Sequence, residues 1–484
     1  MREVVERRTR LVRQLPRIGD RKEVDFTVVV LTPHNRLIRT AYRYHVLSYP
    51  ETGRTHGSVL TEPRCCDRLR KEDQMEVIVE CSCGLDVHQA LIVACLLKGP
   101  ADQRPVKQIR TFSTMTRDLE ALRDWLKGEG CTQVGMESTG VYWVPVYTIL
   151  EGHFELVVGN AQRIRNVPGK KSDVKDGEWL AQLLRHGLIA KSFVPPKPIR
   201  ELRELLRYRR QLIESRSSDR NRLLKLLESA NIKLASVAAD VFGVSGMAML
   251  RALASGDHDP ARLAQLARGA LRKKLEPLCL ALEGRMERSH RLLLEIQLAR
   301  LDESDAHLAR LWQWIGDRLK PYRTQMEQLM EIYGIDQVVA AGLIAEFGVD
   351  MGVFKDVSHM AAWVGVCPGL NQSAGKRLSG RTCKGNPYAR SLLVQAATAA
   401  IRKKGSYLRD KFFRLKARRG YKRALFAIAH KLLIAVYHVL SRGTPYRDLG
   451  EGYLDRLART RIKTHLLARL QRLGYKVTLE PIAA

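Results

Sequence analysis

VIVECSCGLDV (77–87) is a β-rich run, and two more, ALIVACLL (90–97) and VKQIRTF (106–112), follow it after short polar turns. Branched apolar residues are enriched in strands because they fit a pleated, half-buried surface. Three such runs with short connections predict an antiparallel meander. The stretch therefore indicates that a β-sheet begins the main folded part of the chain.

The residues after the meander extend this sheet. Apolar side chains at helical spacing predict a helix at 116–127, with glycines after its end. Two further strands are expected at 132–137 and 154–159, on either side of a helix at 141–150. The order βββαβαβ, followed by helices, predicts an α/β domain with a mixed sheet that is covered on both faces.

Length, composition and charge limit the classes to which the protein can belong. The 484 residues exceed one ordinary domain and predict two to four folded units, and 45% hydrophobic with 27% charged residues exclude a collagen-like or wholly disordered chain. Lysine and arginine number 82 against 51 acids, for a net charge of +31. Repulsion of that size indicates a polyanionic partner, and nucleic acid is the first expectation.

Cysteine usage and apolar segments indicate the compartment. The nine cysteines are scattered without a paired framework, which favours a reduced cytosolic protein. The first 21 residues are charged throughout, so no secretion signal is expected. The most apolar stretch, 424–440, contains His430, Lys431 and His438, which favours a buried helix over a membrane span. We expect a soluble protein without a membrane partner.

Four regions are predicted. Residues 1–75 are basic and irregular, with one strand-like run at 26–31, and receive no function; the α/β domain covers 76–197. Residues 198–320 are rich in Leu and Arg and predict an all-α region, with an antiparallel hairpin or bundle favoured over one long coiled coil. The expected apolar stripes are Leu202, Leu205, Leu206, Leu223, Leu226 and Leu227 in the first long helix and Leu293, Ile296, Leu308, Leu311 and Ile315 in the second.

The fourth region, 321–484, is predicted to be mainly helical. A glycine turn at 333–335 between two short helices has the spacing of a helix-hairpin-helix, although a plain structural turn is the commoner meaning. Apolar helices are expected at 392–401 and 424–439. Residues 376–423 hold sixteen Lys or Arg and one acid, for a net charge of +15. This segment is the strongest candidate for a phosphate-contacting surface.

Four carboxylates form the candidate catalytic set. Asp86 and Glu137 end strands, and Asp173 and Asp176 are spaced so that a helix would put both on one side. Strand ends in such a sheet converge at one edge, so the four acids are expected to meet. Clustered carboxylates repel unless cations lie between them, and paired Mg²⁺ ions held in this way assist displacement at a phosphodiester. Any one of these acids alone would more often be a solvated surface group.

A basic loop precedes the Asp pair. RIRNVPGKKS (163–172) contains Arg163, Arg165, Lys170 and Lys171, which suit it to hold nucleic-acid phosphate near the metals.

At these residues the chain resembles the DEDD-type insertion-sequence transposases, a group of recombinases guided by a structured bridge RNA. The likeness runs from about 77 to 479. GLDVH carries the family's first acid at Asp86, MESTG its Glu at Glu137, and KSDVKDGEWLA its last two acids at Asp173 and Asp176. Residues 1–75 lie outside it.

A second block carries the resemblance into the C-terminal half. YGIDQVVAAGLIAEFG (333–348) and HMAAWVGVCPGLNQSAGKRLSGRTCKGNPYARSLLVQAA (359–397) are similar to the family's second motif, whose serine falls on Ser373. The ending RLQRLGYKVTLEP (469–481) is similar as well. One departure is Gly177, where the family commonly has a small helix former.

The resemblance implies a RuvC-like (RNase H-like) domain that holds Mg²⁺, with Mn²⁺ able to replace it, a helical region used for dimerisation, and a transposase domain with a serine nucleophile. Its implied partners are donor DNA, target DNA and a bridge RNA, with homodimers assembling into a tetramer. The implied location is the prokaryotic cytoplasm, in association with the nucleoid.

The resemblance selects Ser373 as the nucleophile; from the residues alone Ser379 would be an equal candidate and a turn former the commoner role. A serine hydroxyl needs a metal or base nearby to react. Lys376, Arg377, Arg381 and Lys384 are then expected to contact the scissile strand or the guide RNA, with a solvated basic loop as the alternative for each.

Other residues are weaker candidates. The cysteines at 65, 66, 81 and 83 lack zinc-site spacing, so no zinc is predicted. His88 could orient water or substrate, and Tyr142 or Trp143 could stack on a base, with ordinary structural roles as the default.

Three functions are considered. The leading one is a transposase that cuts and rejoins DNA through a phosphoserine intermediate. The alternative is a RuvC-like, metal-dependent nuclease that resolves branched DNA by hydrolysis. The third is a non-catalytic basic scaffold for RNA or DNA.

Overall fold

The structure, a computed structural model, describes residues 24–31, 37–44, 78–100, 103–138, 140–161, 164, 176–369, 371–373, 376–379, 381–382, 384–457 and 459–478. The chain divides into two units, Met1–Glu76 and Val77–Ala484. In the first unit β1 (Val24–Leu31) and β2 (Leu37–Tyr44) pair as an antiparallel hairpin, of which the sequence predicts one strand-like run. The second unit contains the sheet and the helical regions.

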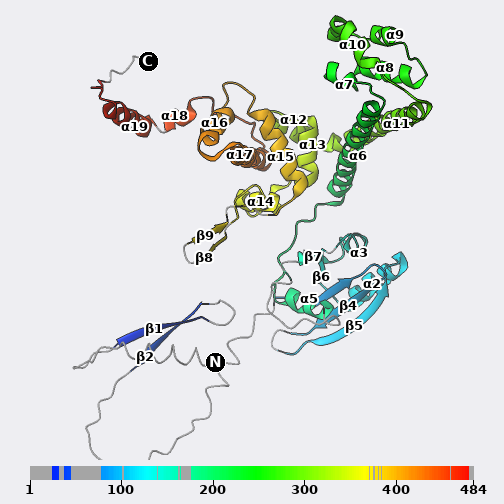
Figure 1. The fold of residues 1–484 in the computed structure, drawn as a ribbon. Helices are drawn as coiled ribbons and strands as arrows, with labels where there is room; N and C mark the ends of the chain where they lie inside the picture. The colour runs from blue at the N-terminus through cyan, green and yellow to red at the C-terminus, as the bar shows by residue number, and fades with distance from the viewer. Residues whose placement is uncertain are drawn as a thin grey trace, which may run out of the picture. The chain divides into compact units, whose positions relative to one another are not determined.

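The second unit starts with a five-stranded mixed sheet (Figure 1). Its strands are β3 (Cys81–Val87), β4 (Leu91–Lys98), β5 (Val106–Ser113), β6 (Gln133–Glu137) and β7 (Glu155–Gly159), in the order β5-β4-β3-β6-β7. The first three strands pair antiparallel, whereas β6 lies parallel to both β3 and β7. The predicted meander and mixed sheet are confirmed.

Helices cover both faces of this sheet. Leu85 and Met136 face a core that includes Leu122 of α2 (Thr116–Gly128) and Leu150 of α3 (Trp143–Leu150). On the opposite face lies α5 (Asp176–Arg185), whose buried leucines and alanine pack against the sheet. The pattern follows from the twofold alternation of side chains along a strand.

Two long helices follow, α6 (Lys197–Ser229) and α11 (Arg288–Leu319), and they form an antiparallel hairpin, which is one of the two arrangements predicted. Ion pairs between the two helices show that they run antiparallel, because residues later in α6 pair with residues earlier in α11. The pairs are Glu201 with Arg318, Arg216 with Asp305, and Asp219 with Arg300. Short helices α7 (Leu234–Val237), α8 (Val244–Ala254), α9 (Pro260–Gln265) and α10 (Leu275–Leu282), with the 3₁₀ segment η2 (Gly269–Lys274), share a core with the adjoining ends of α6 and α11.

One predicted stripe is wrong in detail. Leu293 and Ile296 are 46% and 49% exposed, whereas Leu294 and Leu298 of α11 are buried. Leucine-rich helices offer two overlapping apolar faces, and the position of the short helices α7–α10 decides which one is covered.

The last region is helical, as predicted, and has one core. It contains α12 (Arg323–Met330), α13 (Gln337–Phe347), α14 (Val357–Val364), α15 (Pro387–Ala400), α16 (Tyr407–Arg419) and α17 (Tyr421–Arg442), with the 3₁₀ segments η3 (Lys320–Tyr322) and η4 (Met351–Val353). The first turns of α6 and the last turns of α11 join this core through Ile199, Leu202, Ile315 and Leu319. Helices α18 (Tyr453–Leu457) and α19 (Arg459–Arg472) follow.

The glycine turn between α12 and α13 packs against α15. Gly334 has a φ of +89°, and a β-carbon there would stand 2.2 Å from the carbonyl oxygen of Ala396. The N–H of Val339 at the start of α13 is bound by the side chain of Asp336, 2.8 Å away. Close packing and an acidic cap account for this turn as a structural one.

Helix α17 is long and apolar enough to cross a membrane by length and composition alone. Eight of its side chains are buried within the core of the last region: Ala424, Leu425, Ile428, Ala429, Leu432, Leu433, Val436 and Val439. Such burial is typical of the central helix of a globular domain, in line with the prediction.

Candidate active site

The register of β3 and β6 puts two acids side by side. Leu85 pairs with Met136 across these parallel strands, and Asp86 and Glu137 each follow by one residue. Neighbouring strands are about 4.8 Å apart, and side chains alternate between faces. Leu85 and Met136 point into the core beside α2 and α3. Asp86 and Glu137 therefore belong to the opposite face, which is the face that α5 covers.

Helix α5 brings a third acid to the same face. A β-carbon on Gly84 would stand 2.2 Å from the carbonyl oxygen of Gly177 and 2.4 Å from the nitrogen of Ala181, so the helix backbone lies directly on the strand. Gly84 is two residues before Asp86, and Gly177 directly follows Asp176, the first residue of α5. The glycines thus anchor the helix start beside the ends of β3 and β6.

Of the two predicted acids in the KSDVKDGEWLA stretch, the structure describes Asp176 but not Asp173. Asp176 is half-buried at the helix start. Asp173 lies outside the described residues, as do Arg163, Arg165, Lys170 and Lys171 of the basic loop. Asp86, Glu137 and Asp176 are the three acids of the set that the described part of the chain contains.

The donor set suits a hard divalent cation. Carboxylate oxygens are the ligands that Mg²⁺ and Mn²⁺ take in proteins. Asp86 is 25% exposed and accepts a hydrogen bond from His88, whose Nε2 lies 3.1 Å from its Oδ2. Within the residues that the structure describes, no three His, Cys, Asp or Glu side chains are already arranged as ligands of one metal ion. Strand register and helix contact bring the three acids to the same face of the sheet.

Three cysteines of the sheet domain are largely buried. Burial raises the pKa of Cys83 in β3 well above its usual value, that of Cys95 to about 11 and that of Cys131 to about 12. Cys65 and Cys66 lie outside the described residues.

The predicted nucleophile lies on a small hairpin. Strands β8 (Asn371–Ser373) and β9 (Lys376–Ser379) pair antiparallel, with Ser373 opposite Lys376 at the end where the chain reverses. Ser379 pairs with Asn371 at the other end, and Pro368 bridges Thr382. Ser373 is thus next to the tip, and Ser379 lies near the base.

The predicted basic contacts surround this hairpin in sequence. Lys376 and Arg377 belong to β9, and the backbone oxygen of Arg381 accepts a hydrogen bond of 2.8 Å from the N–H of Gly369. The side chains of Arg381 and Lys384 are exposed. Side-chain positions on the hairpin itself are outside the description.

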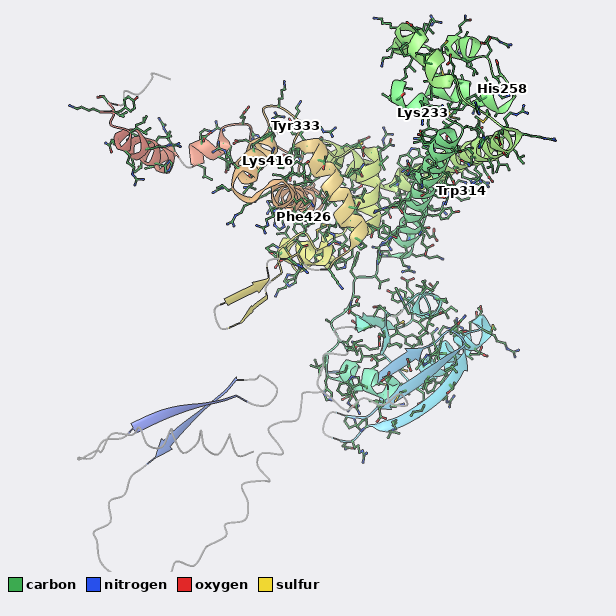
Figure 2. All side chains as sticks on the ribbon, in the orientation of Figure 1. Lys233, His258, Trp314, Tyr333, Lys416 and Phe426 are labelled. Carbon is green, nitrogen blue, oxygen red and sulfur yellow. The ribbon has the colours of Figure 1, made fainter. Side chains whose placement is uncertain are left out.

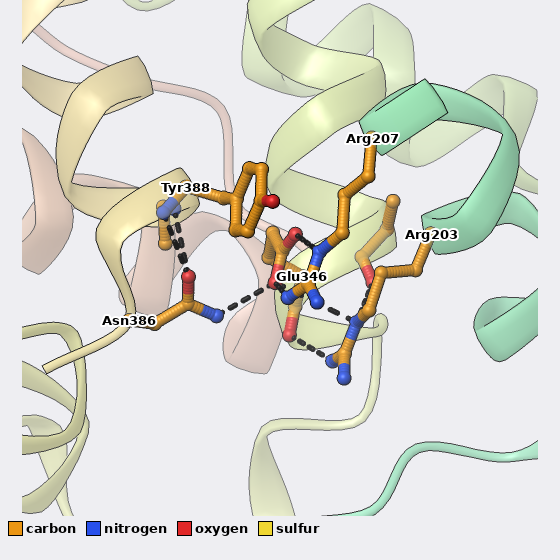
Figure 3. A network of polar contacts seen from close by, with 7 residues as sticks. Arg203, Arg207, Glu346, Asn386 and Tyr388 are labelled. Atoms are coloured by element: carbon orange, nitrogen blue, oxygen red, sulfur yellow. Dashed lines mark hydrogen bonds and ion pairs between the residues drawn. The ribbon is translucent and has the colours of Figure 1, made fainter. Parts of the chain in front are cut away.

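A buried carboxylate that sequence reasoning missed lies at the start of α15, after the hairpin. Glu346 of α13 is only 4% exposed, and its two oxygens accept 2.8 Å hydrogen bonds from Nε and Nη2 of Arg207 (Figure 3). Asn386 donates to the same carboxylate at 2.6 Å, and its own oxygen caps α15 at the N–H groups of Tyr388 and Ala389. One carboxylate therefore joins α6, α13 and the start of α15.

Arginine side chains complete this network. Arg203 donates to the backbone oxygens of Ala345 and Glu346, at 3.1 and 2.7 Å, and the guanidinium of Arg207 stacks on Tyr388 with 4.2 Å to the ring centroid. Burial lowers the pKa of Arg203 to about 10, which still leaves it charged at neutral pH. A lone acid in the apolar run QVVAAGLIAEF was the signal that could have revealed Glu346, because buried charges need partners.

The two aromatic candidates, Tyr142 and Trp143, differ in how exposed they are. Trp143 packs against the sheet core and contacts the ring of Tyr147 edge-on at 5.7 Å, whereas Tyr142 is 42% exposed. Tyr142 is therefore the more exposed ring of this pair.

Two family models match the chain. Residues 83–232 match the model of the DEDD transposases of the IS110 type, described as a transposase, and residues 326–412 match the model described as the transposase IS116/IS110/IS902 family. The first match contains Asp86, Glu137, Asp173 and Asp176, and the second contains Ser373. A search of the curated proteins found no match.

Proposed function

Because the chain belongs to the IS110-type DEDD transposases, we propose that it moves its insertion sequence by cutting and rejoining DNA through a covalent phosphoserine at Ser373. The observation that carries this proposal is the convergence of Asp86, Glu137 and the start of α5 on one sheet face. Like charges on neighbouring strands are unfavourable unless a cation lies between them. That arrangement favours a catalytic site over a passive scaffold.

The α/β domain is proposed to be RNase H-like (RuvC-like). Three antiparallel strands followed by two parallel ones, with acids at the ends of β3 and β6, support this assignment. Its proposed extent is 76–197, followed by a helical dimerisation region at 198–320 and a transposase domain at 321–484. The separate cores of the sheet, the short-helix group and the last helices support three such parts.

Asp86, Glu137, Asp173 and Asp176 are proposed to hold Mg²⁺ or Mn²⁺, which when bound would stabilise the negative charge that develops on the phosphate oxygens. His88 holds the Asp86 carboxylate through its 3.1 Å hydrogen bond and so restricts its rotation. The contact between Gly84 and Gly177 sets the position of Asp176 relative to the strand ends.

In the serine step, the phosphoserine bond keeps the energy of the DNA phosphodiester bond that it replaces. The Ser373 oxygen forms a bond to phosphorus and loses its proton, while one deoxyribose oxygen leaves phosphorus and takes up a proton. A DNA hydroxyl can reverse the same exchange on a new strand, so rejoining requires no ATP. The position of Ser373 next to the hairpin tip, with Lys376 opposite, supports a role at a phosphate.

An apolar groove on the long helices supports the proposed homodimer. It is lined by Leu205, Tyr208, His307, Arg310, Leu311 and Trp314, with Tyr208 and Trp314 52% and 51% exposed. Figure 2 labels Trp314 on this hairpin. Large exposed aromatic side chains on paired helices are typical of protein interfaces. Assembly of two dimers into a tetramer is part of the proposal.

A bridge RNA is the proposed guide, in the cytoplasm and in association with the nucleoid. The net charge of +31 supports a partner with many phosphates. In RNA-guided systems base pairing reads sequence and the protein reads backbone shape.

The test uses Ser373→Ala and Asp173→Asn on DNA that carries the element's ends. The proposal expects a covalent protein–DNA adduct from the wild type and none from Ser373→Ala, with DNA binding retained. A hydrolytic nuclease would still cut DNA after Ser373→Ala. A scaffold would keep every activity after Asp173→Asn.

A further inference from the structure

Helix α16 (Tyr407–Arg419) is a strongly cationic element away from the Ser373 hairpin. It contains six basic residues, Arg409, Lys411, Arg414, Lys416, Arg418 and Arg419, and a single acid, Asp410. Asp410 is bound to Arg414 at 2.8 Å, and Arg414 also pairs with Asp455. Among the described residues no acid lies within ion-pair distance of the other five cations. The helix therefore presents uncompensated charge to an anionic ligand.

An aromatic ring is exposed in the middle of this charge. Phe413 is 47% exposed, and the guanidinium of Arg409 and the ammonium of Lys416 lie 5.1 and 5.7 Å from its ring centroid. Lys416 is labelled on α16 in Figure 2. Both cations are on the same helix face as the ring, one turn before and one turn after it.

A second exposed ring lies nearby. Phe412 is buried, with its ring contacting Phe413 edge-on at 5.4 Å and Tyr421 edge-on at 5.5 Å. Tyr421, the first residue of α17, is 48% exposed, and Gly420 between the helices has a φ of +79°. The core ring thus supports two exposed rings, and the side chains of Lys422 and Arg423 are exposed beside them.

These features match the chemistry of an unpaired nucleotide. A base can stack on an aromatic ring, and the phosphates on either side of it are attracted by nearby cations. A base inside a duplex is already stacked on its neighbours, so its face is not open to such a ring. We propose that Phe413 and Tyr421 form a stacking site for unpaired nucleotides, with Arg409 and Lys416 as phosphate contacts.

The inference rests on the proposed function only in requiring a nucleic-acid partner, since it needs neither Ser373 nor the carboxylates. Unpaired nucleotides occur in the loops of a structured RNA and in a melted DNA strand, and the chemistry above is common to both.

The experiment measures binding of the full-length protein to 2-aminopurine-labelled oligonucleotides: single-stranded RNA, single-stranded DNA and a matched duplex. The expected result for the wild type is fluorescence quenching of the single strands on binding. Phe413→Ala should weaken single-strand binding about tenfold, as loss of one stacked base implies, with the salt dependence unchanged. Duplex affinity should change less than twofold.

Three variants separate stacking from charge and from folding. Phe413→Trp should restore affinity and quenching, whereas Phe413→Leu keeps an apolar contact with Phe412 and should fail to restore quenching. Lys416→Gln should weaken the binding of single strands and of the duplex alike, and it should reduce the salt dependence of that binding. Circular dichroism checks that each variant is folded.

The outcomes are distinct. Stronger quenching with RNA assigns the site to guide-RNA loops, stronger quenching with DNA assigns it to the melted strand, and equal quenching assigns it to either. Single-strand affinity and quenching unchanged in Phe413→Ala would overturn the inference. If Ser373→Ala binds and quenches normally while no adduct forms even in the wild type, the proposed function fails and the stacking site stands.

Discussion

Gly84 of β3 and Gly177 of α5 lie in direct backbone contact, so that a β-carbon on Gly84 would stand 2.2 Å from the carbonyl oxygen of Gly177. The contact is asymmetric. A β-carbon on Gly177 would meet its nearest atoms, the carbonyl oxygens of Val93 and Gly84, at 3.3 and 3.4 Å. Only one of the two glycines is therefore required by sterics.

A matched pair of alanine variants tests this contact. Gly84→Ala should destabilise the protein by about 1–3 kcal/mol or more, because helix α5 must move off the strand. Gly177→Ala should change stability by less than about 1 kcal/mol, since the small displacement it requires is offset by better helix propensity. Thermal or denaturant unfolding measures both. Equal effects would show that the contact does not hold α5 in place.

Loss of the buried carboxylate should destabilise the last region. Glu346→Gln leaves Arg207 without its charged partner, and breaking a buried ion pair costs about 3 kcal/mol. Glu201→Gln is the control, because its 3.7 Å pair with Arg318 is exposed and should be worth less than about 1 kcal/mol. Denaturant titration compares them. A Glu346→Gln protein as stable as the control would contradict the assigned role.

The apolar groove predicts an effect on oligomeric state. If the proposed homodimer forms through this groove, Trp314→Glu should convert it to monomers, because a charge in the contact would be buried without a partner. Leu280→Glu on α10 changes an apolar residue outside the groove that is more exposed than Trp314, 64% against 51%, and should leave the proposed dimer intact. Light scattering after size-exclusion chromatography gives the mass. A dimer that survives Trp314→Glu would place the interface elsewhere.

The buried thiols predict a dependence of stability on alkaline pH. Burial raises the pKa of Cys131 to about 12, so the folded protein keeps this proton at pH values where the unfolded chain, with a thiol pKa of about 9, has lost it. Its contribution is fully present below pH 9 and is lost as pH rises from about 9 to 12.

Denaturant titrations across that pH range provide the measurement. The Cys131→Ala variant should lose stability less steeply than the wild type as pH rises. Parallel curves would indicate that the thiol titrates alike in the folded and unfolded protein.

The sequence predicts the sheet well because alternating patterns and short turns constrain strands locally. Cys83 and Leu85 of β3 and Ile92 of β4 are buried, as the apolar composition of these strands indicates. The helical hairpin was predictable from leucine spacing, but the choice of Leu294 over Leu293 was not, because it depends on which face α7–α10 cover.

The candidate site is predictable only in part for a similar reason. The sequence indicates that Asp86 and Glu137 lie at strand ends. That they lie side by side depends on the pairing of β3 with β6, which are about fifty residues apart in the chain. The roles of Gly84 and Glu346 depend on contacts with α5 and α6, which no local pattern records. The exposure of Phe413 beside buried Phe412 follows from which side of α16 meets α17.

We propose that acids from β3, β6 and the start of α5 hold a divalent cation together. Calorimetric titration of the full-length protein with Mn²⁺ tests it most directly, with Asp86→Asn, Glu137→Gln and Asp176→Asn beside the wild type and Asp257→Asn on the helical region as control. We expect saturable binding in the wild type and the control, and at least tenfold weaker binding in each of the three site variants. Equal Mn²⁺ affinity in all five proteins would contradict it.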